Sequence, residues 1–244
     1  MRLSIVMTYH NRPEQFDNTL RSIYMQDFSN LELIVVDDAS DVGMDARQVL
    51  DDWNVSVTLI EISKEEKHWV NPSVPYNRGF AKVTGDVVVI QNAETLHVGP
   101  VLDQIRKRVT AENYMVCSCY SSTEEEFQRF KHSGTYDEVV RPHKADRWYH
   151  HPTLFPKWYH FCSAMTVENL QRLGGFNEAF AAGYCFEDNE FLLRIRKRLR
   201  LGVEPVEGAY VVHQWHPKNS ALCGGCELWE RNRKLYAKIE ESLR

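Results

Sequence analysis

Residues 31–38 read Leu-Glu-Leu-Ile-Val-Val-Asp-Asp, a nearly unbroken apolar run that ends in two acids. A strand that is buried on both faces of a sheet is apolar throughout, whereas a half-exposed strand alternates apolar and polar residues. Residues 31–36 therefore predict a central strand of a parallel sheet, with Asp37 and Asp38 at its carboxyl end. Ligands of open α/β sheets bind beyond these ends, so both acids are candidate contacts. Asp also favours turns, which is the alternative explanation of the pair.

The alternation of strands and helices continues on both sides of this run. Pro13 can open a helix because its missing N–H needs no partner there, and apolar residues then recur at helical spacing. Strands are expected at residues 3–7, 31–36, 55–62, 87–90, 114–120, 161–166 and 209–212, and helices are expected to begin near residues 13, 45, 76, 99, 167, 187 and 227. This order predicts an α/β fold with one doubly wound, mostly parallel sheet flanked by helices.

The composition excludes some classes of protein. The 244 residues are 43% hydrophobic and 26% charged, with a net charge of -5 and no long basic run, so we expect no nucleic-acid partner. No apolar run approaches the roughly 20 residues that a membrane span needs. No secretory signal is evident, so we expect a cytoplasmic protein with its six cysteines reduced. We interpret Cys223 and Cys226 as part of a turn before the last helix.

Asn92 and Glu94 follow the apolar run of residues 87–90. Side chains at alternate positions of an extended segment point to the same side, so both oxygens can face one hard cation. A turn with an exposed acid is the alternative. His213 and His216 follow the last expected strand. A neutral imidazole beside carboxylates suits manganese better than magnesium, so these residues are candidate metal ligands.

Glu187 and Asp188 open an expected helix, and Glu190 follows within the same turn. Acids at a helix N-terminus are favoured by the helix dipole, but capping does not need three of them. A carboxylate at this position can act as general base for a hydroxyl group of a substrate.

Five segments together resemble the family 2 glycosyltransferases with the GT-A fold, over about residues 1–216. They begin at residues 4, 33, 77, 174 and 186 and read Ser-Ile-Val-Met-Thr-Tyr-His-Asn-Arg, Leu-Ile-Val-Val-Asp-Asp-Ala-Ser, Asn-Arg-Gly-Phe-Ala-Lys-Val-Thr-Gly-Asp-Val-Val-Val-Ile-Gln-Asn-Ala-Glu, Gly-Gly-Phe-Asn-Glu and Phe-Glu-Asp-Asn-Glu-Phe. The resemblance implies a nucleotide-diphosphate-sugar donor, with UDP favoured, and a glycan or other hydroxyl acceptor. It also implies a divalent metal, with Mn²⁺ favoured over Mg²⁺, and inversion at the anomeric carbon.

The resemblance also assigns roles by position. The nucleotide-sugar side would comprise Thr8, Tyr9, Asn11, Asp37, Asp38, Asn77, Arg78 and Asn92. Asp188 matches the family's base and Glu187 its neighbour, while His213 matches a metal ligand of some relatives, with His216 as its competitor. The family usually has Asp-x-Asp where this chain has Asn92-Ala93-Glu94. We expect Glu94 to bind metal still, because it keeps the charge on a longer arm.

The domain organisation that we expect is one GT-A domain over residues 1–244. It comprises a nucleotide-sugar-binding half at 1–120, an acceptor-binding and catalytic half at 121–225, and a C-terminal helix at 226–244. Residues 121–160 would be an irregular insertion over the site. A catalytically inactive relative and a nicotinamide-dependent Rossmann enzyme are the alternatives. The latter is disfavoured because residues 8–13, Thr-Tyr-His-Asn-Arg-Pro, lack the glycine-rich turn that such enzymes need.

Overall fold

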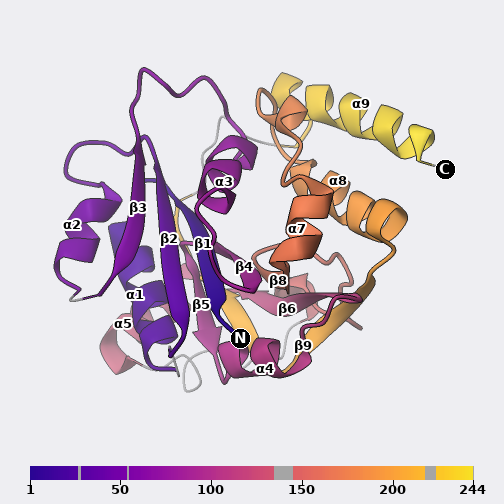
Figure 1. Ribbon diagram of the computed structural model, residues 1–244. Helices are drawn as coiled ribbons and strands as arrows, with labels where there is room; N and C mark the ends of the chain where they lie inside the picture. The colour runs from indigo at the N-terminus through magenta and orange to yellow at the C-terminus, as the bar shows by residue number, and fades with distance from the viewer. Residues whose placement is uncertain (27–28, 54, 135–144, 218–223, 244) are drawn as a thin grey trace.

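The computed structural model describes residues 1–26, 29–53, 55–134, 145–217 and 224–243. Its strands form one sheet in the order β3-β2-β1-β4-β8-β6-β9-β5, with β7 paired to β6 (Figure 1). The first half of the sheet comprises β1 (Leu3–Tyr9), β2 (Leu31–Asp38), β3 (Val57–Ile62) and β4 (Val87–Asn92), and these strands are parallel. The predicted α/β fold with a mostly parallel sheet is confirmed, and the parallel strands bring their carboxyl ends to one edge.

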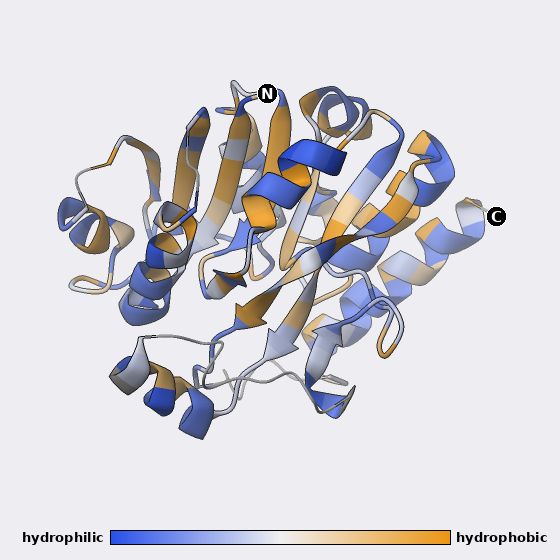
Figure 2. Cartoon of the chain, turned by 90° about the horizontal axis from the view of Figure 1, so that it is seen from below, coloured by the Kyte–Doolittle hydropathy of each residue, from blue (hydrophilic) through white to orange (hydrophobic). Residues whose placement is uncertain are grey.

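Helices cover both faces of the sheet (Figure 1). On one face, α1 (Pro13–Tyr24), α2 (Ala46–Asp51) and α4 (Val101–Arg108) pack on a core that includes Ile5 and Met7 of β1. On the other face, α3 (Ser73–Phe80), α7 (Val167–Leu173) and α8 (Glu187–Arg194) pack on a second core that includes Val6. Successive residues of β1 thus enter opposite cores, which explains why the central strands are apolar throughout. Figure 2 shows the hydrophobic residues concentrated along the strands.

The second half of the sheet is mixed. It contains β5 (Thr95–Val98), β6 (Asn113–Ser121), β7 (Trp148–His150), β8 (Cys162–Thr166) and β9 (Gly202–His213). β8 is antiparallel to β4 and to β6, β9 is parallel to β6, and β5 is antiparallel to β9. Three of these features were not expected from the sequence: β5, β7 and the first half of β9. In β9 the apolar pattern is interrupted near Gly208, which has a φ of +71°, and there the register with β6 shifts.

Two other segments differ from expectation. α3 (Ser73–Phe80) begins before the expected start near residue 76, because Pro72 and Pro75 lie where a helix tolerates proline. Within the expected irregular insertion, the structure has α5 (Glu124–Ser133) and a short 3₁₀ turn, η1 (Ala145–Arg147). A capping box of Thr123 and Glu126 begins α5, and this signal is readable in the sequence. The part of the insertion at residues 135–144 lies outside the described residues.

The chain continues after α7 through a short 3₁₀ turn, η2 (Glu178–Phe180). α8 continues into a π turn, η3 (Ile195–Leu199), and α9 (Glu227–Ser242) ends the described chain. No helix among the described residues is both long enough and apolar enough to cross a membrane. Cys226 directly precedes α9, whereas Cys223 lies outside the described residues.

Candidate active site

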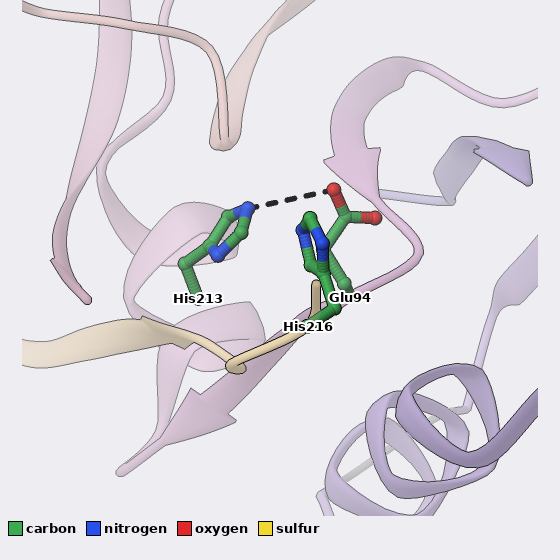
Figure 3. Close-up of side chains that lie close together, drawn as sticks. All are labelled: Glu94, His213 and His216. Atoms are coloured by element: carbon green, nitrogen blue, oxygen red, sulfur yellow. Dashed lines mark ion pairs between the residues drawn. The ribbon is translucent and has the colours of Figure 1, made fainter. Parts of the chain in front are cut away.

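Three candidate metal ligands meet where β4, β5 and β9 converge. Glu94 lies in the turn between β4 and β5, and Thr95 pairs with His213, the last residue of β9. The antiparallel pairing of β5 with β9 therefore brings Glu94 beside His213, with 3.5 Å between Oε1 and Nε2 (Figure 3). One ligand atom from each of Glu94, His213 and His216 lies within 4.8 Å of the other two.

The charges around Glu94 favour its ionised form. Burial opposes ionisation, but the Arg12 guanidinium 3.2 Å away and a hydrogen bond from His213 hold the pKa of Glu94 well below its usual range. Burial, with a further contribution from Arg12, lowers the pKa of His216, so this imidazole is neutral at neutral pH. An ionised carboxylate and a neutral imidazole are the forms that bind a metal.

The spacing of this cluster fits one cation. Two ligand atoms that each lie about 2.1 Å from one ion are roughly 3 to 4 Å apart. The 3.5 Å between Glu94 and His213 falls in that interval, and the remaining separations, up to 4.8 Å, need small side-chain movements. A donor set of one carboxylate and two imidazoles suits a first-row transition metal better than Mg²⁺, which prefers oxygen ligands.

The two adjacent acids at the end of β2 have different surroundings. Asp37 is 3% exposed and accepts hydrogen bonds from the backbone N–H groups of Ser40 and Ala46, so it closes the loop after β2. Asp38 accepts from the Trp69 indole and the Lys67 ammonium, each at 2.8 Å. Neither carboxylate is free of protein partners, and only Asp38 is bound by side chains that a ligand could displace.

At the end of β1, Thr8 pairs in register with Asn92 of β4, and both are partly exposed. Tyr9 instead is 1% exposed, and its hydroxyl donates to the Met44 carbonyl. Asn11 exchanges side-chain and backbone hydrogen bonds with Asp41. The structure thus leaves Thr8 and Asn92 partly exposed at the carboxyl ends of their strands, whereas Tyr9 and Asn11 bind the loop that follows β2. The Asn92 side chain accepts from the Tyr76 hydroxyl.

Asn77 and Arg78 on α3 are both engaged with protein groups. The Asn77 side chain exchanges hydrogen bonds with the backbone of Phe176, so it holds the loop that contains Gly175. Gly175 has a φ of +71°, and a Cβ there would lie 2.4 Å from the Asn77 oxygen. Arg78 forms an ion pair with Glu66 and lies over the Trp69 ring.

Glu187 and Asp188 begin α8, directly after Cys185 and Phe186, which both have left-handed backbone angles. Burial, and then the charge of Glu187, raise the pKa of Asp188 to about 8. Burial also raises the pKa of Glu187, which accepts a hydrogen bond from the Asn71 side chain. A carboxyl with a pKa near neutrality is matched to proton transfer at physiological pH.

Four further residues contact the candidate site residues and were not identified from the sequence. They are Arg12, Lys67, Trp69 and Asn71. Arg12 stands in the segment after the first strand, where a cation could have been noticed. The other three lie in the segment between β3 and α3, which has no periodicity, and their contacts reach residues between 29 and 116 positions away.

Residues 4–188 match the sequence profile described as Glycosyl transferase family 2. The mannosyltransferase PcManGT from Pyrobaculum calidifontis, solved with GDP-Man and Mn²⁺, has a similar structure, with a TM-score of 0.59 and 20% identity over 99% of this chain and 63% of that one. TarS 1-349 from S. aureus, solved with UDP-GlcNAc, gives a TM-score of 0.65 and 15% identity over 98% of this chain and 66% of that one. This chain thus spans less than two thirds of either structure. No curated protein matches it in sequence.

Proposed function

We infer the function from one premise: this chain belongs to glycosyl transferase family 2. We propose that it transfers a sugar from a nucleotide-diphosphate donor, UDP-linked in the first instance, to a hydroxyl acceptor with inversion. Membership of this family sets aside the nicotinamide-dependent alternative. The two similar solved structures are complexes with GDP-Man and with UDP-GlcNAc, which supports the class of donor.

One structural observation supports the proposal above all. A row of aromatic rings runs from the candidate metal cluster toward Asp188. The His213 ring lies 5.5 Å from that of Phe161, and the Phe161 ring lies 6.2 Å from that of Tyr159. The charge of Asp188 in turn helps to raise the pKa of Tyr159, after the effect of burial. A diphosphate at the candidate metal cluster and an acceptor hydroxyl at Asp188 would place the anomeric carbon between them.

In the proposed reaction the acceptor oxygen forms a bond to the anomeric carbon while the bond from that carbon to the diphosphate oxygen breaks. Asp188 takes the proton of the acceptor hydroxyl, and the electron pair of the broken bond leaves with the diphosphate. A divalent cation held by Glu94, His213 and His216 would supply Lewis-acid stabilisation of that leaving group. Arg12, which lies 3.2 Å from Glu94, would add positive charge at the same place.

The test is a screen of the purified protein against UDP-, GDP- and dTDP-sugars, with Mn²⁺, with Mg²⁺ and with chelator. Hydrolysis or transfer of one donor, lost on chelation, is the expected result. An inactive relative would bind the nucleotide without turning over any donor in the presence of acceptor candidates. Absence of both turnover and nucleotide binding in direct titrations would rule out the nucleotide-sugar function.

A further inference from the structure

Asn71 connects the donor half of the molecule to the start of the catalytic helix α8. Asn71 is 1% exposed, and its side chain has hydrogen-bond partners at both ends. The side-chain oxygen accepts from the backbone N–H of Ser73 at 3.0 Å and from the Ser73 hydroxyl, which fixes the first turn of α3. The side-chain N–H donates to Oε2 of Glu187. One amide thus joins α3 to α8 across 116 residues of sequence.

The backbone around Asn71 is attached to the same loop. The N–H groups of Val70 and Asn71 both donate to the Ala181 carbonyl, at 2.8 and 3.1 Å. Residues 181–186 lead directly into Glu187, so the loop and the carboxylate are held by one segment. The side-chain amide of Asn71 therefore has little freedom to move away from Glu187.

The titratable groups around Glu187 and Asp188 are phenols, thiols and the two carboxyls themselves. After the effect of burial, the charge of Asp188 helps to raise the pKa values of four groups: Tyr114 on β6, Tyr159 before β8, Cys185 before α8 and Tyr236 on α9. The charge of Glu187 likewise adds to the effect of burial in raising the pKa values of Tyr76, Tyr184 and Cys185. Phenols and thiols with raised pKa values are neutral at neutral pH. Among the described ion pairs, none includes Glu187 or Asp188. Among the side chains that the structure describes, that of Asn71 donates a hydrogen bond to this pair, at Glu187.

We propose that Asn71 is a positioning residue that keeps the negative charge of the singly ionised carboxyl pair on Glu187 and the proton on Asp188. This inference rests on the proposed role of Asp188 as base. A hydrogen bond to the ionised form of a carboxyl favours that form, so the Asn71 donor makes Glu187 the first to ionise. Asp188 must then lose its proton beside an existing charge. It becomes a stronger base for a hydroxyl than an isolated carboxylate would be.

The experiment compares the pH dependence of kcat/KM in the parent, Asn71→Ser, Glu187→Gln and the double variant. A serine hydroxyl can keep the turn that begins α3 but is too short to reach Glu187. In Asn71→Ser the charge moves in part to Asp188, so we expect the acid limb of the profile to shift to lower pH by roughly one unit. The KM for the donor should stay at the parental value. The same downward shift should appear in a ¹³C carboxyl titration of the free protein.

The control is Ser73→Ala, which removes the hydroxyl at the other end of Asn71 and should leave the acid limb in place. In the Glu187→Gln background, Asn71→Ser should cause no further shift, because the group through which it acts has lost its charge. An unmoved acid limb in Asn71→Ser, or an equal shift in the presence and absence of Glu187, would overturn the proposal. Asp188→Asn tests the base itself, so its failure to reduce transfer would contradict the proposed function instead.

Discussion

Asp37 and Asp38 are adjacent and chemically identical, yet the structure uses them differently. Asp37 binds the backbone of its own loop, which is the structural role that Asp often has in turns. Asp38 faces Lys67 and Trp69, which arrive from a distant segment. At the scale of single residues, the local sequence marks where an acid stands, and the partners decide what that acid can do.

The first prediction concerns Asp188 as general base. Asp188→Asn should lower the transfer rate by about 10²–10⁴-fold, because an amide cannot accept the acceptor proton. Donor affinity should stay within a few fold of the parent, since the substitution removes no proposed donor contact. Steady-state kinetics with an identified donor and acceptor measure the rate, and a nucleotide titration measures affinity. Asp51→Asn, on the exposed end of α2, is the control and should keep parental activity. A parental rate in Asp188→Asn would show that another group is the base.

The second prediction concerns pH. The pKa of Asp188 is about 8 in the folded protein, above the value of about 3.9 for an unfolded chain. Between these values the folded state binds the extra proton, so Asp188 makes the folded protein less stable as pH rises from roughly 4 to 8. The free energy of unfolding of Asp188→Asn should therefore exceed that of the parent by more at pH 8 than at pH 5. Urea unfolding at both pH values measures this, and equal gains would contradict the raised pKa.

The third prediction concerns the candidate metal ligands. Glu94→Gln keeps the size of the side chain but removes the charge that faces Arg12 and His213. We expect Mn²⁺-dependent nucleotide affinity to fall at least about tenfold, or roughly 1.4 kcal/mol. Calorimetric titration with and without Mn²⁺ checks this. Glu61→Gln is the matched control, because Glu61 on β3 is exposed. If the variant keeps the parental gain from Mn²⁺, Glu94 is not a ligand.

At the scale of elements, neighbours in space decide what each helix and strand does for the site. β5 is short, and its pairing with β9 places Glu94 beside His213. Asn77 on α3 binds the loop at Phe176, and Asn71, just before α3, binds the first residue of α8. α9 has the composition of a solvated surface helix, but it contains the fully buried Asn232.

The fourth prediction concerns this contact of α9. Asn232 donates to the carbonyls of Phe180 and Cys185, at 3.0 and 2.8 Å, on either side of Gly183. Asn232→Ala should lower the free energy of unfolding by about 1–3 kcal/mol, because buried carbonyls lose their donor. The transfer rate should also fall, since this loop leads into Glu187 and Asp188. Denaturation and kinetics measure the two effects, with exposed Arg231→Ala as the control. A stability loss with a parental rate would show that α9 does not support the site.

At the scale of the whole molecule, one sheet runs through both halves and brings the ends of β1, β2, β4 and β9 to one edge. The candidate donor site therefore uses residues from both halves. A ligand that contacts both halves stabilises the folded state as a whole, because the unfolded chain has no such site.

The fifth prediction follows from this linkage. Nucleotide at about 100 times its Kd, with Mn²⁺, should stabilise the protein by roughly 2.7 kcal/mol. For a chain of this size that corresponds to a Tm increase of roughly 5–10 °C. Chelator should remove the metal-dependent part of the increase, as should Glu94→Gln. Thermal unfolding measures the shift, with an unrelated anion at the same ionic strength as control. An increase that is indifferent to chelator would contradict a metal at the donor site.

The sequence by itself determined the α/β fold, the family, the position of Asp37 and Asp38 at a strand end and that of Glu187 and Asp188 at the start of a helix. These features depend on local patterns: runs of apolar residues, helical periodicity and motifs of a few residues. The tertiary structure alone decided the pairing of β5 with β9, the partners of Asp38 and the contact of Asn71 with Glu187. Those contacts join segments far apart in the sequence, such as Asn71 and Glu187, which are 116 residues apart. The periodicity within one segment does not indicate which distant segment it will contact. The pKa values of the site residues depend on these long-range contacts, because burial and neighbouring charged groups determine each pKa.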